Sequence, residues 1–437
     1  MSAQSTEGYY SGGHTEGSTA VGLKRHRLCQ RRKALGYSQE RLAELLGVDR
    51  STVVRWERAE TDPQPWHRNR IADGLQVTLE QLDDMLSDVI TPIRRGQTMG
   101  DDTRHSSSAA VRGDLLNGLR TFLASYLPDP QPKPAARSLT EVRRDVTRIH
   151  ALYHRASYSA VARMLPDVLR QATELTDSVA ALHRNSAFRL LAASYLAASK
   201  VAAKIGDGDT ALLTADRAST AARLADDLGL AAVAAYQAAC ALLRLPGRVD
   251  EAERVTQTSI EQLALRGPSR DPDLLSAHGA LLLLAAIIAA RQGQTPDANL
   301  RLADAQRLAA ELKADRNRLW TGFGPTNVAI HTVSAAVKAG NGARAIEIGV
   351  RLDTSRLPAG LVGRRAQVHL DLATATAMGS DGGSLAVLHL LEAERVAPES
   401  VRVNIQARAL LLDLLSKERR SATPGLRPLV ERAGLLA

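Results

Sequence analysis

The sequence predicts an all-α protein, in which a small N-terminal helical domain is followed by an α-solenoid of helical hairpins. Alanine and leucine, both good helix formers, dominate a chain in which aromatic residues make up only 3%. Apolar residues recur at helical spacing between regularly placed glycine or proline breaks. One alanine-rich pattern also recurs at a fixed distance. With 437 residues and a net charge of +9, the chain is long enough for more than one domain and favours a polyanionic partner.

Composition divides the chain into four parts. The first is polar and rich in glycine and serine, which predicts a disordered tail rather than a signal peptide. The third contains the stiff proline-rich stretch Pro128–Pro134 and one amphipathic helix over residues 111–127. We therefore expect a tail at 1–20, a compact helical domain at 21–88, a linker at 89–139 and helical repeats at 140–437.

Start and stop signals predict five helices in the N-terminal domain. Serine, aspartate and threonine cap helix starts, proline suits the first turn, and glycine ends helices. These signals indicate a helix over 22–34 that ends at Gly36, a second from the N-cap Ser38 to Leu46, a third after the N-cap Asp49, a fourth from Pro65 to about Gly74 and a fifth after the N-cap Thr78.

The second and third of these helices have the spacing of a helix-turn-helix. Ala43 is small enough for a second helix to cross closely, and Gly47 can take the positive φ that a tight turn requires. Val53, six residues later, is expected to bury between the two helices. The second helix of such a motif lies in the major groove of DNA, so double-stranded DNA is the expected ligand.

The third helix should present its polar side chains outward, because Val53 and Trp56 point inward. Arginine can donate two bonds to a guanine edge, serine and threonine reach bases or phosphates, and a helix N-terminus favours a phosphate. Residues 21–70 hold twelve basic and six acidic residues, a net charge of +6, although a solvated basic helix would look similar. The predicted DNA contacts are Gln39, Arg50, Ser51, Thr52 and Arg55, with Lys24, Arg31, Arg32 and Lys33 on the first helix.

Residues 21–88 resemble the helix-turn-helix domain of the Xre family, which includes the lambdoid phage repressors. The resemblance implies a fold of five helices, with the second and third as the motif. This chain has arginines where some relatives have glutamines, so the operator sequence does not transfer. By the same resemblance, Gln39 anchors the second helix at the DNA backbone, Arg50, Ser51 and Arg55 read bases, Thr52 contacts a phosphate or base, and Glu57 bonds within the domain.

The region after residue 140 predicts a series of helical hairpins, because each break separates two apolar-periodic stretches. The pattern Ala215, Asp216, Ala221, Ala222, Leu224 recurs at Ala303, Asp304, Ala309, Ala310, Leu312. The offset of 88 residues corresponds to two units of 44. Such a period indicates a solenoid in which each hairpin buries its face on the next.

This region resembles the tetratricopeptide-like repeats of large multi-domain Xre regulators from actinomycete bacteria. The similar segments are GFGPTNVAIH (Gly322–His331), GRRAQVHLDLA (Gly363–Ala373) and SATPGLRPL near the C-terminus. The excess of arginine over lysine, 48 against 8, fits a high-GC genome. The units of about 44 residues are longer than the 34 of that repeat family, so the repeat boundaries are not transferred.

Two pairs of residues in the repeats are candidates for binding an effector. Asn327 and His331 stand four apart on one face of a predicted helix, and an asparagine on a concave repeat surface can hold a peptide backbone. Arg364 and Arg365 could pair with an acidic group. The alternative is a helix cap with ordinary surface charges.

No pattern in the sequence predicts an enzyme, a metal site, a cofactor or a membrane span. The repeat-domain histidines have no metal-ligand spacing, the two cysteines lie far apart, and no nucleophile or phosphate-binding motif occurs. The apolar run Ala280–Ala290 has about half of the roughly 20 residues that a bilayer requires, so it predicts a buried helix.

The sequence therefore predicts a cytoplasmic, nucleoid-associated, sequence-specific DNA-binding transcriptional regulator. Its repeat domain is expected to form a homodimer and to sense a peptide, small molecule or protein. Two alternatives remain open: a repeat-based scaffold for proteins or peptides that is anchored on DNA, and a phage- or plasmid-type repressor. The sign of regulation and the effector are not predicted.

Overall fold

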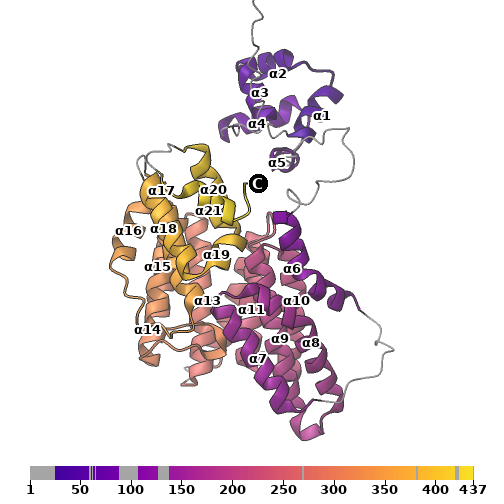
Figure 1. Cartoon of the computed structure of the whole chain (residues 1–437), viewed down its shortest axis with the longest axis vertical. Coiled ribbons are helices and arrows are strands. Elements are labelled where there is room, and N and C mark those ends of the chain that lie inside the picture. Colours follow the sequence, from indigo (N-terminus) through magenta and orange to yellow (C-terminus); the bar gives the residue numbers. More distant parts are fainter. Residues whose placement is uncertain are drawn as a thin grey trace, which may run out of the picture. The chain divides into compact units, whose positions relative to one another are not determined.

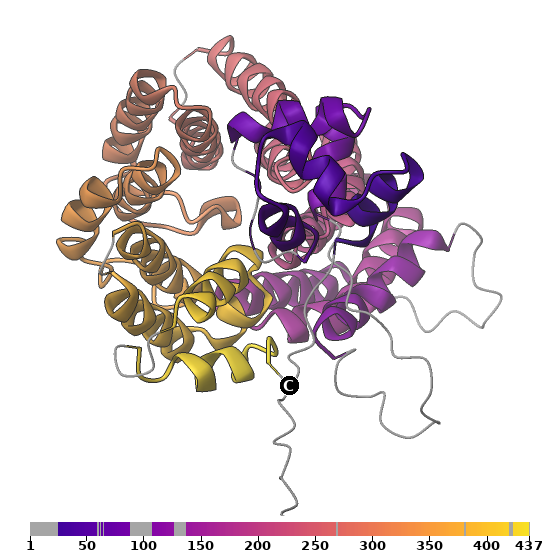
Figure 2. The same ribbon diagram turned by 90° about the horizontal axis from the view of Figure 1, so that it is seen from above.

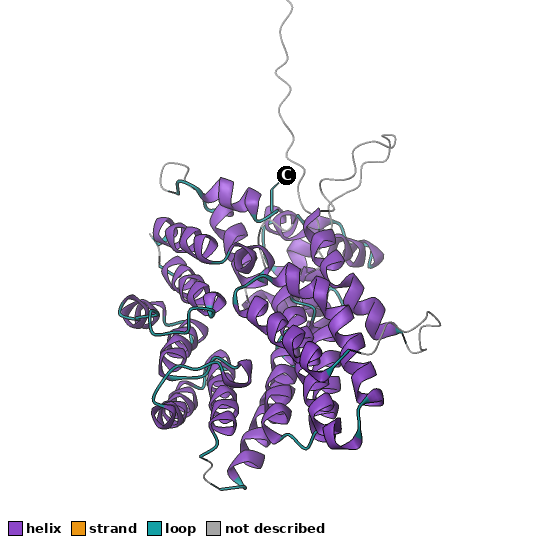
Figure 3. Ribbon diagram, turned by 60° about the horizontal axis from the view of Figure 1, so that its bottom comes forward, coloured by secondary structure: helices purple, strands orange, loops and turns teal. Residues whose placement is uncertain are grey.

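The fold is all-α. The computed structural model describes residues 25–58, 61, 63, 65–87, 107–125, 137–267, 270–379, 382–418 and 423–436. Within these ranges every regular element is a helix, as Figure 3 shows by colour. The chain separates into two compact units, residues 1–100 and 101–437, which are treated individually below. The expected tail and the proline-rich part of the linker lie outside the described ranges, and the four-part division stays a prediction.

The first unit consists of five short helices, drawn in indigo to violet in Figure 1. Ser38 caps the second helix by accepting a hydrogen bond from the Arg41 amide at 3.0 Å, and Gly47 ends it in the left-handed conformation with φ 65°. Leucine, valine, tryptophan and alanine side chains from all five helices form its core. The helices are α1 His26–Ala34, α2 Gln39–Leu46, α3 Arg50–Glu57, α4 Pro65–Gly74 and α5 Leu79–Ser87.

The second unit is a succession of longer helices. It opens with α6 Ser107–Ala124. The sequence predicts this helix over 111–127, so the observed helix both starts and ends a few residues earlier than predicted. The rest are α7 Leu139–His154, α8 Tyr158–Ser178, α9 Arg184–Ile205, α10 Gly208–Leu224, α11 Leu228–Leu242, α12 Val249–Ala264, α13 Pro272–Arg291, α14 Thr295–Leu312, α15 Pro325–Lys338, α16 Gly342–Val350, α17 Val362–Ala377, α18 Gly383–Val396, α19 Pro398–Val403, α20 Ile405–Ser416 and α21 Leu426–Arg432, with short 3-10 turns η1 Ala181–His183 and η2 Arg318–Trp320.

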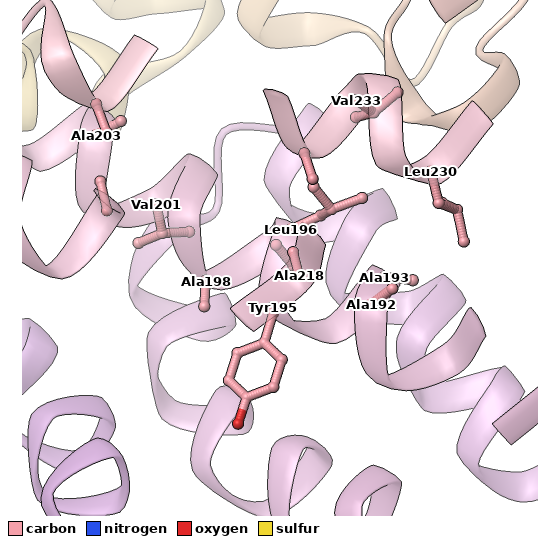
Figure 4. Close-up of a cluster of buried hydrophobic side chains, with 14 of the residues drawn as sticks. Ala192, Ala193, Tyr195, Leu196, Ala198, Val201, Ala203, Ala218, Leu230 and Val233 are labelled. Carbon is pink, nitrogen blue, oxygen red and sulfur yellow. The ribbon is translucent and has the colours of Figure 1, made fainter. Parts of the chain in front are cut away.

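Successive helices of the second unit pack as hairpins, which confirms the predicted solenoid. The 88-residue repeat relates α10 to α14, the second helices of hairpins that lie two apart. Ala221 and its counterpart Ala309 are both buried, whereas Ala303 is exposed where Ala215 is buried. The sequence repeat therefore marks the hairpin period but not the burial of every position. Small residues dominate the interior, and Figure 4 shows alanines of α9 beside Ala218, Leu230 and Val233 of the next two helices.

The two ends of the hairpin series meet. Helix α7 contacts α17, and the hydroxyl of Tyr158 at the start of α8 lies 3.2 Å from the Ser400 hydroxyl of α19. The Ser159 amide also donates to the Glu399 carboxylate at 2.8 Å. Seen from above, the magenta helices α7 and α8 lie next to the yellow C-terminal helices (Figure 2). The repeat unit is thus a solenoid closed on itself.

The apolar run Ala280–Ala290 lies in α13. Among the described residues α13 is long and apolar enough to cross a membrane, with a mean hydropathy of 1.9, but 72% of that apolar window is buried inside the unit. It packs against α11, α12, α14 and α15. This burial is that of a core helix, as the sequence predicts.

Candidate nucleic-acid interface and cavity

The exposed side of α3 forms one wall of a groove in the first unit. Five of the predicted DNA contacts, Lys33, Gln39, Arg50, Ser51 and Arg55, line it together. Thr52 is half-buried and does not line the groove, and Lys24 lies outside the described residues. The remaining lining residues are Cys29, Gln30, Val54, Glu57 and Arg58.

Glu57 is the centre of a hydrogen-bond network beneath this groove. Its carboxylate accepts bonds from the Arg32 guanidinium at 2.6 and 3.2 Å and from the Gln39 amide nitrogen at 2.7 Å. Arg32 also donates to the Tyr37 carbonyl at 2.6 Å, and its side chain is 7% exposed. The expectation that Arg32 faces DNA is therefore wrong, because its charge is buried and paired. Glu57 bonds within the domain, as the family resemblance implies.

Another predicted phosphate contact on α1 also has a bonding role within the unit. Arg31 donates from Nε to the Leu75 carbonyl at 2.9 Å and from Nη2 to the Gln76 carbonyl at 2.8 Å. The neighbouring Arg25 is buried and donates to the Leu86 and Trp56 carbonyls. Counting basic residues along α1 consequently overstates the charge available to DNA; of the predicted contacts on this helix, Lys33 is exposed.

The two arginines of α3 remain accessible. Arg50 forms an ion pair with Glu40 of α2 at 2.5 Å, with both side chains more than half exposed. A hydrogen bond from its own backbone amide, with smaller contributions from Ser38 and Arg50, lowers the pKa of Glu40. An exposed pair of this kind contributes little stability, so Arg50 can exchange Glu40 for another anion. Within the described part of the first unit, Arg55 makes one side-chain hydrogen bond, a long 3.4 Å contact to the Ser51 carbonyl.

The second unit contains a cavity of about 190 Å³ at the place where its two ends meet. It is formed by α7, α8, α9 and α11 on one side of that closure and by α17 on the other, with η2 between them. The lining residues are Tyr153, His154, Tyr158, Lys200, Ala203, Lys204, Val233, Tyr236, Gln237, Cys240, Arg244, Trp320, Thr321, Gly363, Arg364 and Gln367.

Four cationic side chains line this cavity: Lys200, Lys204, Arg244 and Arg364. Among the described residues that line it, none has a carboxylate. The Lys200 ammonium donates to the Trp320 carbonyl at 2.9 Å. Burial, reinforced by Arg364, lowers the pKa of Lys200 to about 7. Burial also lowers the pKa of Lys204 to about 8, with Arg244 as the next cause.

The segment between α14 and α15 brings Trp320 into the cavity wall. Phe323 is fully buried against Gly279 of α13, where any side chain would overlap its ring. The Asp315 carboxylate accepts bonds from the Thr326 amide at 2.9 Å and from its hydroxyl at 2.6 Å, which fixes the start of α15. The Trp320 ring stacks on His150 with centroids 3.8 Å apart. The segment GFGPT is thus a packing and capping motif.

The four predicted effector residues are not brought together. Asn327 and His331 are buried in α15, where the His331 Nδ1 lies 2.9 Å from the Asn327 carbonyl, and neither lines the cavity. Arg365 donates to the Leu357 carbonyl at 2.8 Å and does not line it either. Arg364 does line it and donates to the Thr321 carbonyl at 3.3 Å. A role for these residues in binding an effector stays a prediction.

Sequence reasoning missed the lysines of α9. They stand in LAASKVAAKI, where Lys200 and Lys204 interrupt an otherwise small and apolar stretch at a spacing of four. That spacing places both ammonium groups on one face of a helix whose neighbours are core residues. Charged residues inside an apolar stretch are the signal that could have found them.

Comparison with known proteins supports the first unit's assignment. Residues 30–82 match the protein family described as Helix-turn-helix. No curated protein matches the chain. Among solved structures, the chain is similar to the Bacillus thuringiensis PlcR in complex with the peptide PapR7 and DNA, with a TM-score of 0.32, 11% identity, and coverage of 74% of this chain and 93% of that one. The structural likeness at this level transfers no residue roles. The family match shows that residues 30–82, which include α2 and α3, constitute a helix-turn-helix domain.

Proposed function

We propose that the protein is a cytoplasmic, sequence-specific DNA-binding transcriptional regulator. The observation that carries this is the exposed face of α3, where Arg50, Ser51 and Arg55 line one groove within a helix-turn-helix domain. In such domains the second helix of the motif enters the major groove of DNA.

The groove residues divide into two roles. Arg50 and Arg55 read base edges, because a guanidinium can donate two parallel bonds to a guanine. Gln39 and Lys33 hold phosphates and so fix the register of the domain on the duplex. The Glu57 carboxylate, which binds the Gln39 amide at 2.7 Å, supports this arrangement by setting the orientation of that side chain before DNA arrives.

Replacing Arg55 with alanine tests the base-reading role. We expect the substitution to lower affinity for the preferred site by about 1 to 3 kcal/mol and to relax preference at one base position. The measurement is selection of bound sequences from a random DNA library by the full chain and its variant, followed by titration of the selected site.

The matched control is Arg143→Ala, which removes the same charge from an exposed position of α7 in the other unit. It should leave both affinity and base preference unchanged. A uniform loss on all sequences with Arg55→Ala would assign Arg55 to phosphate contact instead and contradict base reading.

We further propose that the repeat unit forms a homodimer and senses an effector. A single helix-turn-helix reads few base pairs, whereas two of them spanning half-sites about 34 Å apart gain specificity. The cavity in the repeat unit supports an effector role, because it offers charged groups that no protein carboxylate neutralises among the residues lining it. Light scattering of the full chain on DNA tests the dimer, and a mass of one chain per duplex would contradict it.

A further inference from the structure

We propose that the cavity of the repeat unit binds a small molecule with a carboxylate or phosphate group on a compact, ring-sized apolar body. The regulatory use of this site rests on the function proposed above; the binding itself does not. The argument concerns Lys200, Lys204, Arg244 and Arg364, the cations that line the cavity.

The first step is the balance of charge. Lys200 is 6% exposed, and in the described part of the chain none of the four cations forms an ion pair with a carboxylate. The carboxylate of Asp371 in α17 acts electrostatically on Lys204 without forming an ion pair with it, and it accepts a hydrogen bond from the Gln367 amide nitrogen at 2.9 Å. It also accepts a bond from the Ser334 hydroxyl. Burying cations without anions costs free energy, which an anionic ligand would offset.

The second step is a polar atom that lacks a partner. His154 lines the cavity and is 8% exposed. Among the described residues its Nε2 has no hydrogen-bond partner within normal geometry, although the Trp320 backbone interacts with the ring. Burial lowers the pKa of His154 far below its usual value, so the ring is neutral. A neutral imidazole can donate from Nε2, which gives a bound anion one further donor beside the ammonium and guanidinium groups.

The third step is the size and the apolar lining. Tyr153, Tyr236 and Trp320 supply aromatic surface, and Ala203 and Val233 supply small aliphatic surface. The volume of about 190 Å³ is below the roughly 300 to 1,000 Å³ of pockets for larger ligands. A compact body the size of one ring fits this space, and a nucleic-acid duplex does not.

Isothermal titration of the full chain with three matched probes tests the proposal. Benzoate and phenyl phosphate have the two anionic groups on the same ring, and benzamide has a neutral polar group in their place. We expect both anions to bind once per chain, with benzamide at least tenfold weaker. The tighter of the two anions identifies carboxylate or phosphate as the group that the site prefers. Equal binding of benzamide, or no heat with either anion at millimolar concentration, would overturn the proposal.

Variants then place the binding in the cavity. Arg364→Gln and Lys204→Gln should each weaken the better probe at least tenfold, whereas Arg351→Gln, at an exposed position of the same unit outside the cavity, should not. Trp320 is the one tryptophan after residue 66 in the sequence, so saturable quenching that Trp320→Phe abolishes reports occupancy here. Near-ultraviolet circular dichroism identifies any variant that misfolds. Undiminished affinity in folded Arg364→Gln and Lys204→Gln would contradict this site.

The two proposals fail separately. DNA binding without ligand should be the same in Arg364→Gln and in the unmodified chain. If Arg55→Ala relaxes base preference while no anion binds, the regulator stands and the cavity proposal falls. If anions bind in the cavity but the chain selects no DNA sequence, the cavity proposal stands and the proposed function falls.

Discussion

At the scale of single residues, the reading surface depends on one buried carboxylate. Glu57 pairs with Arg32 below the groove and holds the Gln39 side chain beside it. Both partners come from other helices, α1 and α2. A single residue at the end of α3 thus joins all three helices that form the groove.

Glu57→Gln should destabilise the first unit, because it leaves the buried Arg32 guanidinium without a counter-charge. We expect a loss of about 3 to 5 kcal/mol in the free energy of unfolding. In a Trp320→Phe background, tryptophan emission during urea unfolding reports only Trp56 and Trp66 of this unit. The control Glu44→Gln breaks an exposed pair with Arg41 and should cost less than about 1 kcal/mol. Equal losses in the two variants would contradict the role of Glu57.

At this scale, roles that depend on neighbouring residues could be predicted from the sequence, and hydrogen-bond partners that lie far apart in the chain could not. Ser38, Gly47 and Val53 lie where spacing and capping rules predict them, because their roles depend on neighbours a few residues away. Arg32 looks like any basic residue of α1, and its burial depends on Glu57, 25 residues further along the chain. Composition therefore predicted the sign of the domain's charge but not which arginines are accessible.

At the scale of elements, the packing of the segment before α15 depends on the space that one glycine leaves in another helix. Gly279 leaves room on α13 for the Phe323 ring, which is fully buried there. Phe323 in turn follows Trp320, whose carbonyl accepts the Lys200 bond and whose ring stacks on His150. The position of the cavity wall therefore depends on the packing of this segment against α13.

Gly279→Ala should lower the stability of the repeat unit by about 1 to 3 kcal/mol, because the new methyl group overlaps the Phe323 ring. Thermal unfolding of the full chain measures the effect. Gly360→Ala is the control, since nothing lies within 4 Å of its added methyl group. In the double variant, Phe323→Leu should recover part of the loss. A midpoint for Gly279→Ala equal to that of the control would mean that the ring is not held against α13.

Helix α9 makes the stability of the repeat unit depend on pH. The pKa of Lys200 is about 7, below its usual 10.5, mainly through burial and secondarily through Arg364. The unfolded state consequently binds more protons above about pH 7, and stability rises with pH up to about 10.5. The titratable and charged groups around it are His150, Tyr153 and His154 of α7, Lys204 of α9, Tyr236 and Cys240 of α11, Arg244 and Arg364.

We expect Lys200 to raise the free energy of unfolding of the repeat unit by about 2 kcal/mol between pH 7 and pH 9, and Lys204 to add a smaller rise over the same interval. Urea unfolding measures it, followed by the part of the tryptophan emission that Trp320→Phe removes. Lys200→Met should reduce this rise to the smaller part that Lys204 contributes, because methionine carries no proton at any pH and the pKa of Lys204 is about 8. The affinity for benzoate should fall over the same interval as the two lysines lose their charge. A rise of the same size in Lys200→Met would assign the pH dependence to other groups.

At the scale of the whole molecule, the period of the repeats was predictable and the closure of the ring was not. The 88-residue offset follows from alanine spacing within helices, so it appears in the sequence. Closure depends on contacts such as Tyr158 with Ser400 and Ser159 with Glu399, between residues about 240 positions apart. No periodicity encodes such pairs. The cavity that the closure creates was consequently missed, although two of its lysines stood out in an apolar helix.

If the cavity regulates DNA binding, the coupling between the two must be reciprocal. An anion that changes the affinity for DNA by some factor must have its own affinity changed by the same factor when DNA is bound. Factors of about 5 to 150 are typical of such coupling. Titrating the better probe into the free chain and into the DNA complex, and DNA into the chain with and without the probe, measures both factors. A loss of DNA affinity that keeps growing with probe concentration, instead of levelling off, would mean that the anion competes for the basic groove lined by Arg50 and Arg55. Arg364→Gln separates the two cases, because it should abolish coupling through the cavity and leave competition at the groove unchanged.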